Sequence, residues 1–210
     1  MVDDGGDLVS RTVSTGKMWE QDLINAITPY LSVDKEVIEV GSYIGDHTIY
    51  LSKHSKKVWA FEANKVSYAK LLFNLDVNGC KNTYPFNFII GRGKYIPADY
   101  TKDFRNDPVN NPSGNRYIEF VHGEEAASLD ELLFNEVESL AVLKVDCEGM
   151  DYGIVCSALD LIKKFKPVIA FEYNWYISKE KPEDFDTLLK PFGYKPAVRV
   201  DTWNWLCTML

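Results

Sequence analysis

The chain has 210 residues, 46% hydrophobic and 26% charged, a balance that excludes wholesale disorder, a fibrous repeat and a coiled coil. It carries 23 Lys and Arg against 31 Asp and Glu, and the net charge of −8 makes nucleic acid an unlikely main partner because acidic surfaces repel phosphates. The four cysteines lack zinc-site spacing. Neither a signal peptide nor an apolar run of membrane-spanning length is apparent. We therefore expect a cytoplasmic protein without membrane contact, of unknown oligomeric state.

The N-terminal half of the chain alternates between expected helices and strands. Residues 1–14 are polar and rich in glycine, so we expect a mobile tail, followed by one domain over 15–210. Apolar residues at helical spacing predict a helix over 17–31. The expected elements that follow are a strand at 36–40, a helix capped by Asp46, a strand at 57–61, a helix from Asn64 to Asn78 closed by Gly79, and a strand at 86–90. This alternation predicts βαβ units and a parallel sheet.

Residues 91–127 interrupt the pattern and predict a long loop with some strand near 117–121. Regularity then returns in the remaining part of the chain. The expected elements there are a short helix after Ser128, a strand at 140–145, a helix at 150–165, a strand at 168–173, a helix at 182–191 closed by Gly193, and a hairpin of 197–200 with 203–207. The whole indicates an α/β fold.

The turn after the first strand is the expected ligand site, because open α/β sheets bind ligands at the carboxyl ends of their strands. A dinucleotide fingerprint that starts at Gly41 would need glycines where Tyr43 and Asp46 stand, so a pyrophosphate is disfavoured. Glu62 ends the second strand about 20 residues later, where a carboxylate accepts hydrogen bonds from ribose hydroxyls. This combination favours a nucleoside without a diphosphate, such as S-adenosylmethionine (SAM).

Several segments together resemble one known family. VIEVGSYIGDHT at 37–48 and WAFEAN at 59–64 resemble the first two motifs of SAM-dependent methyltransferases. LKVDCEGMD at 143–151 and KPVIAFE at 166–172, preceded by Ser128-Leu129-Asp130, are similar to the FkbM-type methyltransferase family. Tyr43 departs from the small or amide residue of many relatives, and Asp151 stands where Glu is usual.

The resemblance implies a Rossmann-like class I methyltransferase fold, with a mostly parallel seven-stranded sheet, helices on both faces and an antiparallel last strand. It also implies SAM as methyl donor and a hydroxyl acceptor on a sugar or other small molecule. Glu62 would hold the ribose, and Asp146 would lie beside the reacting centre. The cofactor-binding residues that we expect are Glu39, Gly41, Ser42, Tyr43, Gly45, Thr48, Glu62, Ala63 and Asp146.

A hydroxyl is a poor nucleophile, so methyl transfer to it benefits from a general base. Asp146, Glu148 and Glu172 are the catalytic candidates, because the ends of their strands should face one crevice and clustered carboxylates raise one another's pKa. His47 and His122 are further candidates. Each has a structural alternative: Glu148 could favour a helix dipole, and Glu172 could pair with Lys144 or Lys166. The same carboxylates could instead bind Mg²⁺ or Ca²⁺ through their oxygens, but we rank this interpretation below a general base and expect no metal.

Aromatic residues outside these motifs are interpreted first as packing. Trp19 and Glu20 belong to an N-terminal helix that could cover the cofactor, and Trp203 and Trp205 should share one side of a strand. The aromatic residues of the long loop that could stack on a sugar ring are Tyr95, Tyr100, Phe104 and Tyr117. We therefore predict an O-methyltransferase. An N-methyltransferase on the same fold and a non-catalytic SAM-binding protein are the alternatives.

Overall fold

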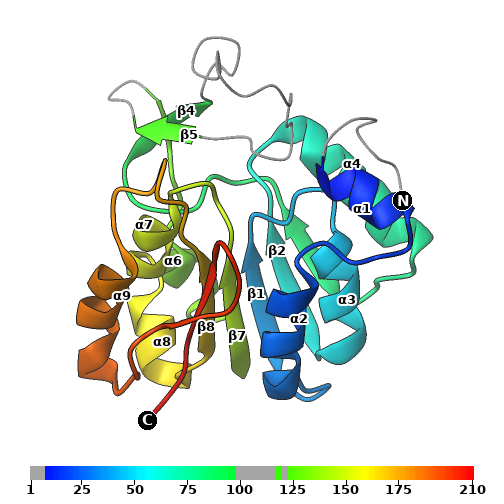
Figure 1. The fold of residues 1–210 in the computed structure, drawn as a ribbon. Helices are drawn as coiled ribbons and strands as arrows, with labels where there is room; N and C mark the ends of the chain where they lie inside the picture. Colours follow the sequence, from blue (N-terminus) through cyan, green and yellow to red (C-terminus); the bar gives the residue numbers. More distant parts are fainter. Residues whose placement is uncertain (1–7, 98–116, 120–122) are drawn as a thin grey trace.

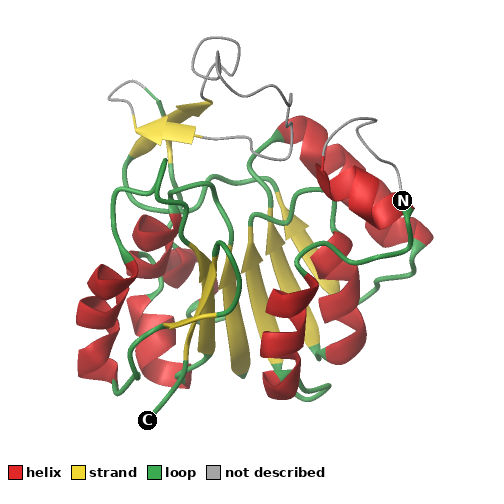
Figure 2. Ribbon diagram, viewed as in Figure 1, coloured by secondary structure: helices red, strands yellow, loops and turns green. Residues whose placement is uncertain are grey.

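A computed structural model describes residues 8–97, 117–119 and 123–210, and shows a seven-stranded sheet with helices on both faces (Figures 1 and 2). Along the sheet the strands run β3 (Thr83–Phe86), β2 (Lys57–Phe61), β1 (Glu36–Val40), β7 (Leu140–Val145), β8 (Val168–Glu172), β10 (Asn204–Cys207) and β9 (Val198–Arg199). The first five are parallel, and β10 runs antiparallel to both of its neighbours. The predicted fold class, with its antiparallel last strand, is confirmed.

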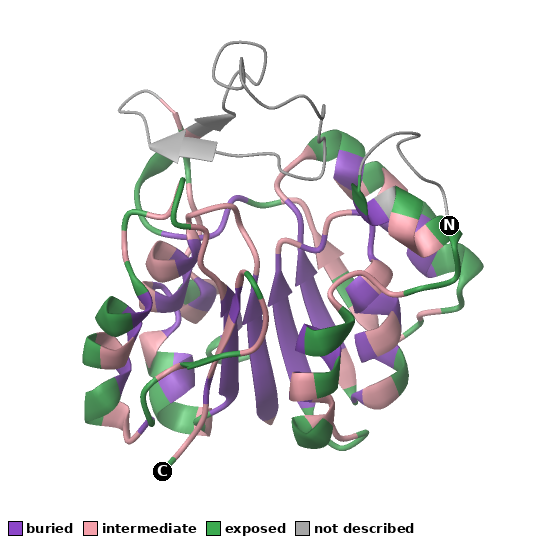
Figure 3. Ribbon diagram, in the orientation of Figure 1, coloured by how far each residue is buried: buried purple, intermediate pink, exposed green. Residues whose placement is uncertain are grey.

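Successive side chains of each strand point to opposite faces of the sheet, and the strands are buried throughout their central part (Figure 3). Val37 and its same-face neighbours pack with α2 (Gln21–Ile27), beside α3 (Asp46–His54) and α4 (Lys65–Val77). Ile38 faces the larger cluster. The helices of that second face are α6 (Leu129–Leu133), α7 (Asp151–Cys156), α8 (Leu159–Phe165) and α9 (Pro182–Leu189). Continuous apolar runs such as that of β1 follow from this burial on both faces.

The N-terminal region differs from its prediction. Residues 8–14, assigned above to the tail, form helix α1 (Leu8–Ser14), whereas residues 1–7 lie outside the described part. The helix expected over 17–31 begins only at Gln21, because Glu20 has the left-handed φ and ψ of 45° and 49° and so cannot continue a right-handed helix. It ends in the 3₁₀ turn η1 (Thr28–Tyr30), which contains Pro29. The N-cap of α3 is Gly45 rather than Asp46.

The third strand lies earlier than predicted, at Thr83–Phe86 instead of 86–90. The side chain of Asn87 explains this end, because its amide donates hydrogen bonds to the carbonyls of Glu62 and Ala63 at 2.7 and 3.0 Å. A side-chain amide thus takes the place of the backbone ladder. Asn64 caps α4 as predicted, accepting from the backbone N–H groups of Val66 and Ser67.

The helix predicted over 150–165 is broken into α7 and α8. The carbonyl of Ser157 accepts a hydrogen bond from the backbone N–H of Asp130 at 2.9 Å and another from the Ser128 hydroxyl. The Asp130 carboxylate in turn accepts from the backbone N–H groups of Asp160 and Leu161 at the start of α8. Residues near α6 therefore satisfy the backbone groups of the break.

The segment expected as a long loop contains a second sheet, which lies beyond the carboxyl ends of the main strands (Figure 1). Its antiparallel strands are β4 (Lys94–Pro97), β5 (Tyr117–Glu119) and β6 (Glu124–Glu125). The strand expected near 117–121 is confirmed over 117–119. The C-terminal hairpin is also confirmed, and the turn η3 (Lys190–Phe192) with Gly193 follows α9. In the described ranges, no helix has the length and apolar character needed to cross a membrane.

The candidate active site at the carboxyl ends of the central strands

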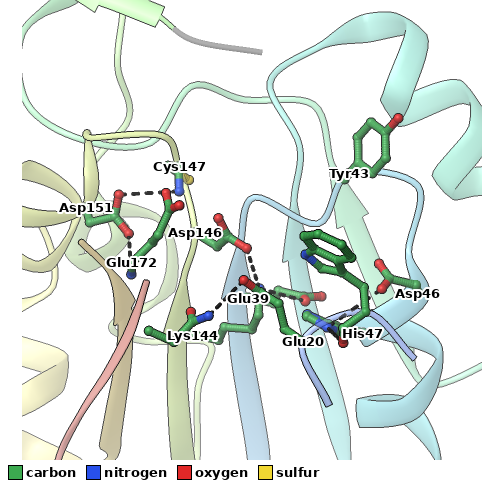
Figure 4. Close-up of polar contacts among 12 residues, drawn as sticks. Glu20, Glu39, Tyr43, Asp46, His47, Lys144, Asp146, Cys147, Asp151 and Glu172 are labelled. Carbon is green, nitrogen blue, oxygen red and sulfur yellow. Dashed lines mark hydrogen bonds and ion pairs between the residues drawn. The ribbon is translucent and has the colours of Figure 1, made fainter. Parts of the chain in front are cut away.

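Parallel pairing brings the predicted carboxylates to one edge of the sheet (Figure 4). Val40 at the end of β1 pairs with Val145, and Val145 pairs with Phe171 of β8, so the residues that follow these strands are neighbours. The backbone N–H of Asp146 donates to the Val40 carbonyl at 3.0 Å and extends this contact by one step. Asp146 and Glu172 therefore lie at the same edge of the sheet, where the sequence analysis expects the ligand crevice.

The two glycines of the turn after β1 have positive φ angles, and Gly41 also lies against backbone. Gly41 has a φ of +86°, and a Cβ there would lie 1.8 Å from the Asp146 carbonyl oxygen. Gly45 has a φ of +91°, and a Cβ there would lie 2.6 Å from Leu71 Cδ1. Tyr43 between them also has a positive φ of 45°. Both glycines are thus needed by the fold, whether or not a ligand uses the turn.

Glu62 ties this turn to the end of β2. Its Oε2 accepts a hydrogen bond from the backbone N–H of Tyr43 at 2.8 Å, and its Oε1 accepts from that of Asn64 at 2.7 Å. Burial raises its pKa to about 7, with Asp146 and Glu39 adding to the shift and the two backbone hydrogen bonds opposing it. Each carboxyl oxygen keeps a second lone pair for a further donor such as a ribose hydroxyl.

The buried Glu39 and Lys144 form a charged group with the partly exposed Asp146. The Lys144 ammonium lies 3.6 Å from Glu39 Oε1 and 3.5 Å from Asp146 Oδ2. Thr48 donates its hydroxyl to Glu39 Oε2 at 2.6 Å. Burial lowers the pKa of Lys144, but the surrounding carboxylates, Asp146 and Glu39 first, outweigh it and raise the pKa above its usual value. Lys144 thus pairs with Glu39 and Asp146, and among the described residues no ion pair joins it to Glu172, which was one of the two structural alternatives weighed above.

Asp151 and Glu172 form a second set of carboxyl groups. Asp151, the first residue of α7, accepts from the backbone N–H of Glu172 at 3.0 Å and from that of Cys147 at 3.4 Å. Burial, followed by the charge of Asp146, raises the pKa of Asp151. Burial also raises the pKa of Glu172 far above its usual value, with Asp146, Glu148 and Asp151 contributing. The buried Oε2 of Glu172 has no hydrogen-bond partner among the described residues.

The segment before α2 contacts the start of α3; the sequence analysis places its Trp19 and Glu20 on a helix that could cover the cofactor and names His47 a further candidate. His47 Nε2 lies 2.8 Å from the Trp19 carbonyl oxygen, which only accepts, so Nε2 carries the proton. Glu20 Oε1 accepts from the side-chain amide of Asn204 at 2.8 Å, and burial raises the pKa of Glu20. Asn204 pairs with Glu172 in the sheet. The left-handed conformation of Glu20 leaves no sequence signal, since it is not a glycine.

The polar groups that lack partners test whether SAM fits. In the described part of the chain, the buried oxygens without a hydrogen-bond partner include Glu20 Oε2, Ser42 Oγ and Asp46 Oδ2, besides the one on Glu172. Acceptors of this kind suit the ammonium group of a methionyl moiety, and the negative surroundings suit a sulfonium rather than a phosphate. The described residues contain no group of three or more His, Cys, Asp or Glu arranged to hold a metal ion. The residues present fit the cofactor.

The model of the Methyltransferase FkbM domain family matches residues 39–196. The chain belongs to the FkbM methyltransferase family. The match begins at Glu39, at the base of the crevice, and includes Asp146 and Glu172. No curated protein matches the chain.

Solved structures share the fold of this FkbM chain. The FkbM methyltransferase from Methylobacillus flagellatus has a TM-score of 0.57 at 16% identity, over 83% of this chain and 44% of that protein. A candidate methyltransferase from Streptococcus mutans, in complex with SAH, has a TM-score of 0.56 at 12% identity, over 97% of this chain and 100% of that protein. Precorrin 8w decarboxylase from Methanobacterium thermoautotrophicum has a TM-score of 0.53 at 13% identity, over 100% of this chain and 100% of that protein. The chain spans less than half of the Methylobacillus protein.

The remaining candidates of this FkbM chain fall in several places. Glu148, in the turn after β7, has a positive φ of 50°. His122, Tyr100 and Phe104 lie outside the described residues, as does the side chain of Tyr117. The Tyr95 hydroxyl donates to the carbonyl of Arg92 at 2.8 Å, within its own loop.

Proposed function

We propose that the chain is a SAM-dependent O-methyltransferase that acts on a hydroxyl of a sugar or another small molecule. The observation that carries this proposal is the pair of carboxyl groups at the ends of β7 and β8. Asp146 is held by the Lys144 ammonium at 3.5 Å, and the buried Oε2 of Glu172 is free for a ligand. Membership of the FkbM family and the SAH-bound Streptococcus mutans neighbour support the choice of cofactor.

The cofactor would be held from three sides. Glu62 would accept hydrogen bonds from the ribose hydroxyls through its remaining lone pairs, beside Ala63. Ser42 Oγ, Asp46 Oδ2 and Glu20 Oε2 would meet the methionyl end, because none of these three atoms has a hydrogen-bond partner among the described residues. When bound, SAM supplies a methyl group on a positively charged sulfur. Glu39 and Thr48 support the turn from below without needing to touch the ligand, because they bond to each other.

The two carboxyl groups have different tasks in this proposal. Asp146 is partly exposed, with a quarter of its side chain accessible, so it can reach an acceptor and take up the hydroxyl proton. Glu172 retains its own proton at neutral pH because burial and neighbouring carboxylates raise its pKa. It would therefore donate a hydrogen bond that orients the acceptor oxygen. Glu148 enters as a neighbouring charge that keeps Glu172 protonated.

The negative crevice also favours a cationic acceptor, which makes N-methylation the second candidate. A protonated amine would be attracted by Asp146 but must lose its proton before it can react. Methyl transfer from labelled SAM to methyl glycosides and to primary alkylamines separates the two reactions. The O-methyltransferase proposal is overturned if amines are methylated and glycosides are not.

The test of the active site uses two variants and one control. We expect Asp146→Asn to keep SAH binding, measured by calorimetry, and to lower kcat by roughly 10²–10⁴-fold, the usual worth of a general base. Glu172→Gln keeps a donor at that position and should retain more activity than Glu172→Ala. Glu138→Gln, on an exposed residue in the turn before β7, should leave both readouts unchanged. Absence of SAH binding to the wild type would refute the cofactor, and full turnover in Asp146→Asn would refute the base.

A further inference from the structure

Three aromatic side chains gather where the loop after β8 meets the turn before β10, and we name them the tryptophan platform: Trp175, Tyr176 and Trp203. The ring centroids of Trp175 and Trp203 are 4.4 Å apart, and those of Trp175 and Tyr176 are 5.5 Å apart. Trp175 is 49% exposed and Tyr176 is 79% exposed. Exposed aromatic rings that contact one another form a contiguous apolar patch, and such patches mark ligand or partner sites.

The backbone around the platform is held rigidly. The Asn174 side-chain oxygen accepts from the backbone N–H of Tyr176 at 3.1 Å, and the Asn174 carbonyl accepts from the N–H groups of Ile177 and Ser178. On the other side, the backbone N–H of Trp203 donates to Asp201 Oδ1 at 2.9 Å. Such a frame positions the rings before a ligand arrives and so reduces the entropy lost on binding.

The same segments connect the platform to the proposed catalytic groups. Trp175 stands three residues after Glu172, and Trp203 directly precedes Asn204, whose amide donates to Glu20. The Tyr173 N–H donates to the Trp203 carbonyl at 2.8 Å and joins the two segments. Both segments lie at the carboxyl edge of the main sheet, where the loop after β8 and the turn of the C-terminal hairpin are drawn in Figure 1. A ring on the platform would thus lie near the reacting groups.

We propose that the tryptophan platform binds the acceptor as a neutral saccharide ring, stacked through its C–H face. This inference rests on the proposed function, whose acceptor hydroxyl it locates on a sugar. Aromatic faces bind the apolar side of a pyranose, while neighbouring polar groups such as Glu172 bond to its hydroxyls. The acidic crevice repels anionic ligands. Trp203, which the sequence analysis interprets first as packing, contacts the acceptor in this proposal.

The binding test uses indole N–H signals in a ¹⁵N-correlated NMR spectrum, because the chain has five tryptophans that single Trp→Phe variants can assign. The probes are methyl α-glucopyranoside and methyl α-mannopyranoside, titrated to their solubility limits without SAM. We expect the signals of Trp175 and Trp203 to shift. Trp59 serves as internal control, since its indole N–H donates to the buried Glu36 at 2.7 Å. Absence of shifts at Trp175 and Trp203, or equal shifts at Trp59, overturns the platform.

Two variants extend the test to the enzyme. Trp175→Ala should raise the KM for a methyl glycoside about tenfold while SAH affinity stays unchanged, and Trp175→Phe should recover part of this loss. Tyr30→Ala, at an aromatic residue that is 42% exposed in the turn η1 before β1, should change neither. An unchanged KM in Trp175→Ala overturns the platform but leaves the proposed methyl transfer intact. Shifts caused by tetramethylammonium but not by glycosides overturn the saccharide and point to cation–π binding.

Failure of the proposed function gives a different pattern. If SAH does not bind and no methyl transfer occurs, the methyltransferase assignment fails, whatever the NMR titration shows. Glycoside-induced shifts at Trp175 and Trp203 would then identify a saccharide-binding protein. The two sets of measurements are therefore independent.

Discussion

The ammonium of Lys144 lies 3.6 Å from Oε1 of Glu39, and both side chains are only 1% exposed. The two residues are also direct neighbours in the β1–β7 ladder, so the ion pair crosses the centre of the sheet. A buried ion pair of this kind contributes little net stability when complete, but loss of one partner leaves an uncompensated charge. Lys144 has the further task of neutralising Asp146 at the mouth of the crevice.

The first prediction concerns removal of that ammonium. Lys144→Met should lower the free energy of unfolding by about 3–5 kcal/mol at neutral pH, because Glu39 and Asp146 lose their shared cation. Denaturant unfolding measures the change. Lys56→Met, which breaks the exposed ion pair with Glu138, should leave the melting temperature nearly unchanged.

A double variant distinguishes lost charge pairing from lost packing. Glu39→Gln combined with Lys144→Met removes one of the stranded carboxylates, so part of the lost stability should return. If the single and the double variant lose the same stability, the packing of the lysine side chain, and not its charge, accounts for its contribution to stability.

The second prediction concerns the backbone contact between Gly41 and Asp146. Gly41→Ala should lower the free energy of unfolding by about 3 kcal/mol or more. The new Cβ would clash with the Asp146 carbonyl, and alanine would also be strained at a φ of +86°. Gly79→Ala is the matched control, with a φ of +67° and open space around the position, and should cost about 1–2 kcal/mol. Thermal unfolding and SAH calorimetry measure both. Equal costs at the two glycines would contradict the close approach.

The sequence predicts the strands of the main sheet other than β3, and it places Asp146 and Glu172 after neighbouring strands, because these features depend on local signals. Buried parallel strands appear as apolar runs, and strand ends place the following residues at one edge. The antiparallel last strand came from the family resemblance. Asn64 likewise shows its capping role through its position before a helix.

Other features depend on contacts between distant segments and have no local signal. The break between α7 and α8 is made by Ser128 and Asp130, nearly thirty residues upstream of the carbonyl that they occupy. Asn87 ends β3 by bonding to residues of another strand. Glu20 is held in the site by its left-handed backbone conformation and by a hydrogen bond from the Asn204 side-chain amide. No periodicity or spacing in the sequence encodes these pairings.

The third prediction concerns the pH dependence of stability. The pKa of Glu62 rises from 4.5 to about 7 on folding because the buried side chain resists ionisation. The folded state therefore binds this proton more tightly than the unfolded state. The resulting contribution of about 3 kcal/mol is present below pH 4.5 and is lost as the pH rises to about 7. Asp151 and Glu20 shift in the same direction, so they steepen the decline.

Glu62→Gln isolates the part that belongs to this residue. The amide cannot ionise, so the fall in stability between about pH 5 and pH 8, measured by chemical unfolding, should be shallower than in the wild type. Glu138→Gln is the control, because the pKa of this exposed carboxyl is lowered by Lys56 and its removal should not flatten the decline. If wild-type stability instead increases through this range, or if Glu62→Gln has the same slope, the raised pKa of the buried Glu62 is contradicted.

Proton release on SAH binding gives a second measurement of the same group. Ribose hydroxyls that donate hydrogen bonds to Glu62 favour its ionised form, so SAH binding near pH 6.5 should release protons in the wild type and fewer in Glu62→Gln.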